Sequence, residues 1–131
     1  MINLPRIPNL LINHPASDIN IKKAEAELNM VLPHAYTALL KQINGFSIDG
    51  ELLIYGTEDI VERNETWEVH DYANGYVEIG DDGGGQVFLM RQAEEEKKVW
   101  IVDAGVIDPQ HVEMMTLDLI KWVSDGCIIE V

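Results

Sequence analysis

Residues 76–90 read Tyr-Val-Glu-Ile-Gly-Asp-Asp-Gly-Gly-Gly-Gln-Val-Phe-Leu-Met, two strand-like segments joined by two aspartates and three glycines. Residues 76–79 alternate in polarity and residues 86–90 form an apolar run, so residues 80–85 are predicted to connect two strands. Three consecutive glycines allow positive φ angles or a close approach to other groups. A phosphate-binding loop would need a helix N-terminus and usually a lysine, whereas here two aspartates precede the glycines and a strand follows.

Two helices are expected before this stretch. Ser17 or Asp18 caps the first, whose apolar face is Ile21, Ala24 and Leu28. Pro33 suits the first turn of the second. Its apolar positions follow at helical spacing, at Tyr36, Leu39, Leu40 and Ile43, and Asn44-Gly45 is expected to end it.

Strands are expected at Glu51–Tyr55, Gly75–Ile79, Gln86–Met90 and Lys98–Val102. Thr57–Asp71 has no clean period and is interpreted as a loop with some helical turns, and Arg91–Lys98 as an exposed hairpin tip. A last helix is expected over Leu117–Ser124, capped by Thr116 and carrying an apolar face, with a short terminal strand after Gly126.

These elements predict one α+β domain over residues 1–131, with helices packed on a mainly antiparallel or mixed β-sheet. Residues 1–16 hold three of the five prolines and are expected to form an extended N-terminal arm over the core.

Several motifs, taken in order, resemble the SMI1/KNR4 family, also called the SUKH superfamily, over residues 18–126. The resemblance rests on Leu-Pro-His-Ala-Tyr at 32–36, Asn-Gly-Phe at 44–46, Leu-Ile-Tyr-Gly at 53–56 before an acidic segment, and Ile-Gly-Asp-Asp-Gly-Gly-Gly at 79–85. Phe88, Val-Trp-Ile at 99–101 and a last helix with Leu119, Ile120 and Trp122 complete it. It implies the family's α+β fold, no cofactor, and a structural signature loop made of Gly80, Asp81, Asp82, Gly83, Gly84 and Gly85.

Composition narrows the class of partner. Acidic residues number 23 against 9 basic ones, a net charge of −14, which disfavours nucleic acid and anionic membranes as partners. Residues 49–82 hold eleven carboxylates against one base, Arg63. Such a field attracts a basic partner, although acidic residues also serve plain solubility. No run of apolar residues is long enough for a membrane helix, and no secretory signal is recognised, so we expect a soluble cytoplasmic protein.

No active site is assembled by the sequence. Asp81-Asp82 lacks the spacing of a calcium loop, so a structural turn is favoured over a Mg²⁺ or Ca²⁺ site. The four histidines form no metal-ligand pair, and we expect them at the surface or at caps. Cys127 is the single cysteine and is expected to be a buried thiol. We therefore expect no enzyme activity and no metal.

The resemblance implies a function, because many bacterial members of this family are immunity proteins against secreted toxins, often nucleases or other nucleic-acid-modifying enzymes. We expect a cognate toxin domain, basic in charge, as the partner. From composition, we expect carboxylates to steer the partner by charge and aromatic side chains to be buried against it as anchors. These residues are Glu58, Asp59, Glu62, Glu65, Trp67, Glu68, Asp71 and Tyr72. Packing of Trp67 onto the sheet is an equal alternative for that ring.

Two other functions stay open at this point. The first is a regulatory protein-interaction module resembling the family's fungal cell-wall regulators. The second is a small hydrolase that uses Asp82, which the absence of catalytic motifs disfavours.

Overall fold

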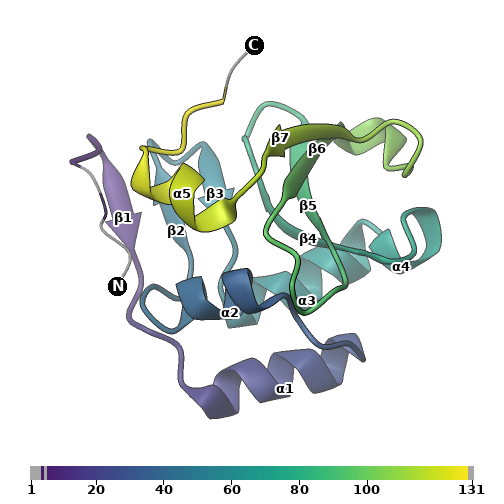
Figure 1. Ribbon diagram of the computed structural model, residues 1–131, viewed down its shortest axis with the longest axis horizontal. Helices are drawn as coiled ribbons and strands as arrows, with labels where there is room; N and C mark the ends of the chain where they lie inside the picture. Colours follow the sequence, from purple (N-terminus) through teal and green to yellow (C-terminus); the bar gives the residue numbers. More distant parts are fainter. Residues whose placement is uncertain (1–3, 5, 130–131) are drawn as a thin grey trace.

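The computed structural model describes residue 4 and residues 6–129, and it is built around one seven-stranded sheet (Figure 1). Every strand pairs antiparallel with the next strand in the chain, so the spatial order equals the sequence order. The strands are β1 Leu10–Ile12, β2 Phe46–Ile48, β3 Leu52–Ile54, β4 Tyr76–Asp81, β5 Gln86–Arg91, β6 Val99–Asp103 and β7 Glu113–Thr116.

Five α-helices and one short 3₁₀ helix accompany the sheet in the described residues. They are α1 Asp18–Leu28, α2 His34–Leu40, α3 Thr57–Thr66, α4 Val69–Tyr72, η1 Ala104–Val106 and α5 Leu119–Ser124. The predicted α+β fold is confirmed, and the sheet is wholly antiparallel. Among the described residues, no helix combines the length and the apolar character needed to cross a membrane.

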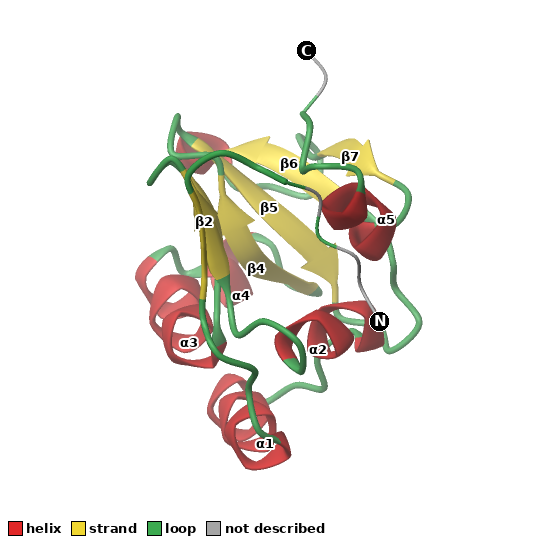
Figure 2. Ribbon diagram, turned by 90° about the vertical axis from the view of Figure 1, so that its left-hand side faces the viewer, coloured by secondary structure: helices red, strands yellow, loops and turns green. Residues whose placement is uncertain are grey.

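The sheet buries both of its faces (Figure 2). Helices α2 and α5 lie on one side, and α3 and α4 lie on the other. Strand β5 shows why, because Phe88 and Met90 join the large core with α2 and α5, whereas Val87 and Leu89 join a second core with α4. Successive residues of a strand point to opposite faces, so a strand with four buried residues in a row needs cover on both.

The first two helices follow the sequence expectation with one change. Ser17 caps α1 through a reciprocal capping box with Asn20, and Ile21 and Ala24 are buried. Helix α2 buries Tyr36, Leu39 and Leu40 but ends at Leu40, short of the expected Asn44-Gly45 end. Gly45 has another reason to be glycine: at φ +85°, a Cβ there would lie 2.6 Å from the backbone nitrogen of Gly56.

Thr57–Asp71 was expected to be a loop with some helical turns; the helical part is present, but the loop is wrong, because the segment forms α3 and most of α4. Only Thr57, Ile60 and Asn64 of α3 are buried, at spacings of three and four, so its apolar stripe is too narrow for the periodicity to be recognised. Glu58 and Asp59 lie in the first turn, where the positive end of the helix dipole favours carboxylates.

Four strands were expected, and all are present, with bounds that differ by one or two residues. Strands β1, β2 and β7 were not expected. In the N-terminal arm, Leu10–Ile12 pairs with β2, while residues 1–3 and 5 lie outside the described part.

The C-terminal region differs from expectation at both ends of its helix. Helix α5 begins at Leu119 and is capped by Asp118 rather than by Thr116, which belongs to β7. Residues 127–129 are not a strand, so the expected terminal strand is wrong over the described residues after Gly126.

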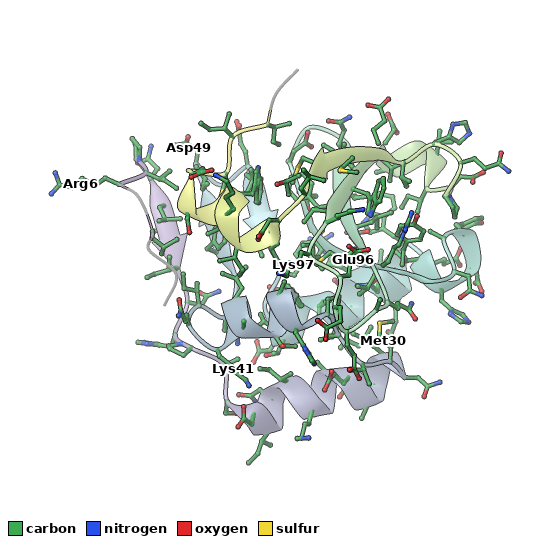
Figure 3. The ribbon with its side chains drawn as sticks, viewed as in Figure 1. Arg6, Met30, Lys41, Asp49, Glu96 and Lys97 are labelled. Carbon is green, nitrogen blue, oxygen red and sulfur yellow. The ribbon has the colours of Figure 1, made fainter. Side chains whose placement is uncertain are left out.

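The tip between β5 and β6 is exposed in its side chains, but its backbone joins two helices (Figure 3). The carbonyl of Glu94 accepts from the backbone nitrogen of His34 at the start of α2, at 2.9 Å. The carbonyl of Lys97 accepts from the backbone nitrogen of Leu119 at the start of α5, at 2.8 Å. The labelled Glu96 and Lys97 accordingly lie between these two helices.

Helix α3 is attached to the sheet by one buried side chain, Asn64. Its amide nitrogen donates to the carbonyl of Glu78 at 2.9 Å and to that of Ile60 at 2.7 Å. Its amide oxygen accepts from the backbone nitrogen of Glu78 at 2.8 Å. Strand β3 pairs with β4 only through Leu53 and Ile54, so it does not reach Glu78. The Asn64 side chain supplies the hydrogen bonds that a neighbouring strand would otherwise make to the backbone of Glu78.

We predict that Asn64→Ala lowers the free energy of unfolding by about 2–3 kcal/mol, because it leaves buried backbone groups of Glu78 unpaired. Urea denaturation measures this loss. Asn74→Ala, at an exposed asparagine, is the matched control and should change stability by less than about 0.5 kcal/mol. Equal stability of the two variants would show that Asn64 does not hold α3.

Candidate functional site

The eight residues expected to contact a partner all lie on α3, α4 and the turn between them, and all are exposed. We call these residues, 58, 59, 62, 65, 67, 68, 71 and 72, the acidic surface. Glu58, Glu62 and Glu65 follow at i, i+4 and i+7, so they share one face of α3. Arg63 is the one base in the segment, and its Nε lies 3.5 Å from Glu62 Oε2.

The two aromatic side chains of the acidic surface differ in exposure. Trp67 follows the last residue of α3 and retains 38% of its surface, and Tyr72 ends α4 and retains 61%. Glu68, between them, has a positive φ of 52°, which few non-glycine residues adopt, and it is the N-cap residue of α4. Val69 is the residue of this turn that packs into the core, and the Trp67 ring stays in partial contact with solvent.

Glu78 is the carboxylate that sequence reasoning misplaced. Counted within the acidic segment of residues 49–82, it is fully buried and contributes no surface charge. A β-bulge at Ile79 shifts the register, so that Glu78 faces Leu89 and Asp81 faces Val87 across the pair. Both partners belong to the second core, so the bulge places two carboxylates three residues apart on the same face of β4.

The Tyr55 hydroxyl lies between these two carboxylates. Its oxygen is 2.7 Å from Glu78 Oε2 and 2.6 Å from Asp81 Oδ2. A phenol has one proton and can donate to only one carboxylate. The other contact is satisfied when Glu78 is protonated and donates to the Tyr55 oxygen, while Tyr55 donates to Asp81.

The environment of Glu78 favours that protonated form. Burial, and to a smaller extent the charge of Asp81, raise its pKa from 4.5 to about 7, against the opposing effects of Tyr55 and Arg63. Its Oε1 is buried without a hydrogen-bond partner, which costs far more for a charged oxygen than for a neutral one. Burial likewise raises the pKa of Tyr55, which therefore stays protonated.

The loop Gly80–Gly85 is held by its own aspartates. Asp81 Oδ1 accepts from the backbone nitrogen of Gly83 at 3.0 Å, and Asp82 Oδ1 accepts from those of Gly84 and Gln86 at 2.8 and 3.0 Å. These are turn-forming contacts, and they use the Oδ1 atom of each aspartate. Gly83, at φ +73°, comes so near to residue 51 that a Cβ would lie 2.5 Å from its carbonyl oxygen.

The remaining chemical candidates lie apart. The four histidines are all exposed, as expected, and among the described residues no three His, Cys, Asp or Glu side chains gather in a way that could hold a metal. Cys127 is buried, also as expected, and burial raises the pKa of its thiol to about 12. A thiol of that pKa is a poor nucleophile at neutral pH.

Two features escaped the sequence analysis. The first is the burial of Glu78. Strand alternation predicts that Glu78 and its apolar neighbours in β4 point to different faces of the sheet, but it does not reveal that α3 and α4 cover the face of Glu78. The exposed Val106 in η1 lies far from the acidic surface in sequence yet lines a groove with Trp67 and Tyr72. Packing in the second core, where Ile107 lies with Val69 of α4, brings the two segments together, and no sequence signal indicated it.

Comparison with known proteins identifies a family. The sequence model of the SMI1 / KNR4 family (SUKH-1) matches residues 15–125. No curated protein sequence matches the chain.

The buried Glu78 predicts a pH dependence of stability. A carboxyl group whose pKa is raised by folding stabilises the folded state fully below its unfolded pKa of 4.5, and this contribution is lost as the pH rises through about 7. A shift of this size is worth about 3 kcal/mol. We therefore expect the free energy of unfolding to fall between about pH 5 and about pH 8, with a smaller fall in Glu78→Gln.

The pH series is measured by urea denaturation. At about pH 8 the Gln variant should be the more stable, since a neutral amide still reaches the Tyr55 oxygen. Glu51→Gln, which removes an exposed carboxylate, should retain the wild-type profile. Parallel profiles of wild type and Glu78→Gln would mean that Glu78 is ionised throughout.

We also predict that neither Mg²⁺ nor Ca²⁺ binds at Asp81-Asp82 with micromolar affinity, because the turn already uses these oxygens. Isothermal titration calorimetry with each ion measures this. Micromolar binding that Asp82→Asn abolishes would overturn the structural role of the loop.

Proposed function

Because the chain belongs to the SMI1 / KNR4 family (SUKH-1), with a match over residues 15–125, we propose that it is a non-enzymatic immunity protein that binds and neutralises a cognate secreted toxin. Many bacterial members of the family have this role. The proposal is about binding, since the described residues offer an exposed charged surface and no cluster of metal ligands.

The observation that carries the proposal is the acidic surface. Six carboxylates and one arginine occupy residues 57–72, and all six carboxylate side chains are exposed. Exposed charges of one sign accelerate the encounter with an oppositely charged partner. Toxins that act on nucleic acid need basic substrate grooves, so we propose a nuclease or another nucleic-acid-modifying domain as the partner.

The attachment of α3 supports a preformed surface. Asn64 and Ile60 anchor the buried side of the helix, so Glu58, Glu62 and Glu65 hold their spacing before any partner arrives. A preformed surface avoids the cost of ordering a loop on binding.

The test is affinity purification of the tagged protein from its native cells at low and at moderate salt, with partners identified by mass spectrometry. One stoichiometric basic toxin domain supports the proposal. Recovery of several host proteins without a toxin would support a regulatory interaction module instead.

With that toxin domain in hand, we predict that reversing the charge at Glu62, Glu65 and Glu68 slows association by about tenfold or more and weakens its dependence on salt. Stopped-flow kinetics at several salt concentrations measure both. The matched control reverses three exposed carboxylates away from this surface, Glu94, Glu95 and Glu113. If both triple variants associate equally fast, steering comes from net charge and not from α3.

A further inference from the structure

A groove of about 440 Å³ lies where the acidic surface meets the turn after β6. Trp67, Glu68 and Tyr72 line one side, and residues 104–108 line the other. Figure 1 shows α4 and the β6–β7 connection at the same end of the molecule, although more than thirty residues separate them in the chain.

The groove has a buried floor and exposed apolar walls. Ile107, only 8% exposed, belongs to the second core with Val69, so the floor is fixed by packing. Val106 retains 48% of its surface, and Trp67 and Tyr72 also remain in contact with solvent. A cluster of exposed apolar side chains around a concave site is a surface that gains free energy when an apolar group covers it.

The turn that presents Val106 is held in place from within. Asp103 Oδ1 accepts from the backbone nitrogen of Gly105 at 2.7 Å, and Asp108 Oδ1 accepts from that of Gln110 at 2.8 Å. These bonds cap both ends of the turn. Val106 is therefore presented on a fixed support, as an anchor contact requires.

The rim of the groove is acidic. Glu68 lines it on one side and Asp108 on the other. None of the described residues that line the groove is basic. Charge complementarity thus selects an occupant with positive charge on both sides of an apolar group, and the Trp67 ring also attracts cations.

We propose that this groove is the anchor pocket for a basic segment of the protein partner, which inserts one aliphatic or aromatic side chain flanked by Lys or Arg. The inference rests on the proposed function in taking a toxin domain as that partner. Apolar anchors in a central pocket supply most of the binding energy at protein interfaces, and the surrounding carboxylates set rate and orientation.

The first experiment needs no identified toxin. The ¹⁵N-labelled protein is titrated by NMR with the capped peptide Lys-Lys-Leu-Leu-Lys-Lys, and with two reference peptides in which Ser replaces Leu or Glu replaces Lys. We expect saturable shifts of the Trp67 indole and of the Val106 amide with the first peptide. Each reference peptide should bind about tenfold more weakly or not at all.

Two variants with the same charge change locate the site. Val106→Lys places a positive charge in the groove, which repels the Lys residues of the first peptide and should weaken its binding by about tenfold. Ile19→Lys, at an exposed site on α1, should leave the affinity for this peptide unchanged. Equal binding of the Leu and Ser peptides, or equal affinities of the two variants, would overturn the groove as an anchor pocket.

The toxin domain separates this inference from the proposed function. If Val106→Lys leaves the dissociation rate of the toxin domain unchanged while charge reversal on α3 slows its association, the anchor pocket is wrong and the immunity role stands. If no toxin is recovered but the peptide results hold, the groove stands as a binding site for basic segments and the immunity role fails.

Discussion

One hydroxyl group, that of Tyr55, connects most of the structure. Its oxygen lies between the buried Glu78 and the partly buried Asp81, and its single phenolic proton can be donated to only one of them. The backbone of the same residue donates to Ile79 at 2.8 Å and accepts a hydrogen bond from the Tyr36 hydroxyl. Helix α2, strand β4 and the glycine loop are thus tied to one position. The family's motif segments, far apart in sequence, meet here, which explains why they mark a fold rather than a chemical site.

The acidic surface depends on this buried centre through Asn64. That side chain bonds to the backbone of Glu78, so α3 carries exposed carboxylates on one side while its other side completes the sheet. The geometry of the surface is therefore set by a hydrogen-bonded core. This arrangement also accounts for the two kinds of acidic residue in one segment: those on α3 and α4 face water, and burial raises the pKa of Glu78 to about 7.

Where local patterns were strong, the sequence predicted the structure well. The capping box at Ser17, the apolar spacing of Tyr36 and Leu39 and the runs that became β4, β5 and β6 are all local signals. Strands β1, β2 and β7 have three or four residues each, and only pairing across the sheet defines them. The exposed residues of the acidic surface were predicted from composition, but their helical arrangement was not. Val106 was missed as a wall of the groove because core packing between segments far apart in the chain brings it near Trp67.

The plain order of the sheet has a kinetic consequence. Since β4 to β7 are consecutive in the chain and pair in that order, residues 76–116 can build half of the sheet by successive hairpin closures, without waiting for the N-terminal part. Pairings of this kind close short loops, which are the fastest tertiary contacts to form. Residues 104–108, one wall of the groove, belong to this hairpin segment. Helices α3 and α4, which carry the acidic surface, pack against one face of the sheet (Figure 2). In this order of assembly the acidic surface would form last, when α3 and α4 pack onto a sheet that is already in place.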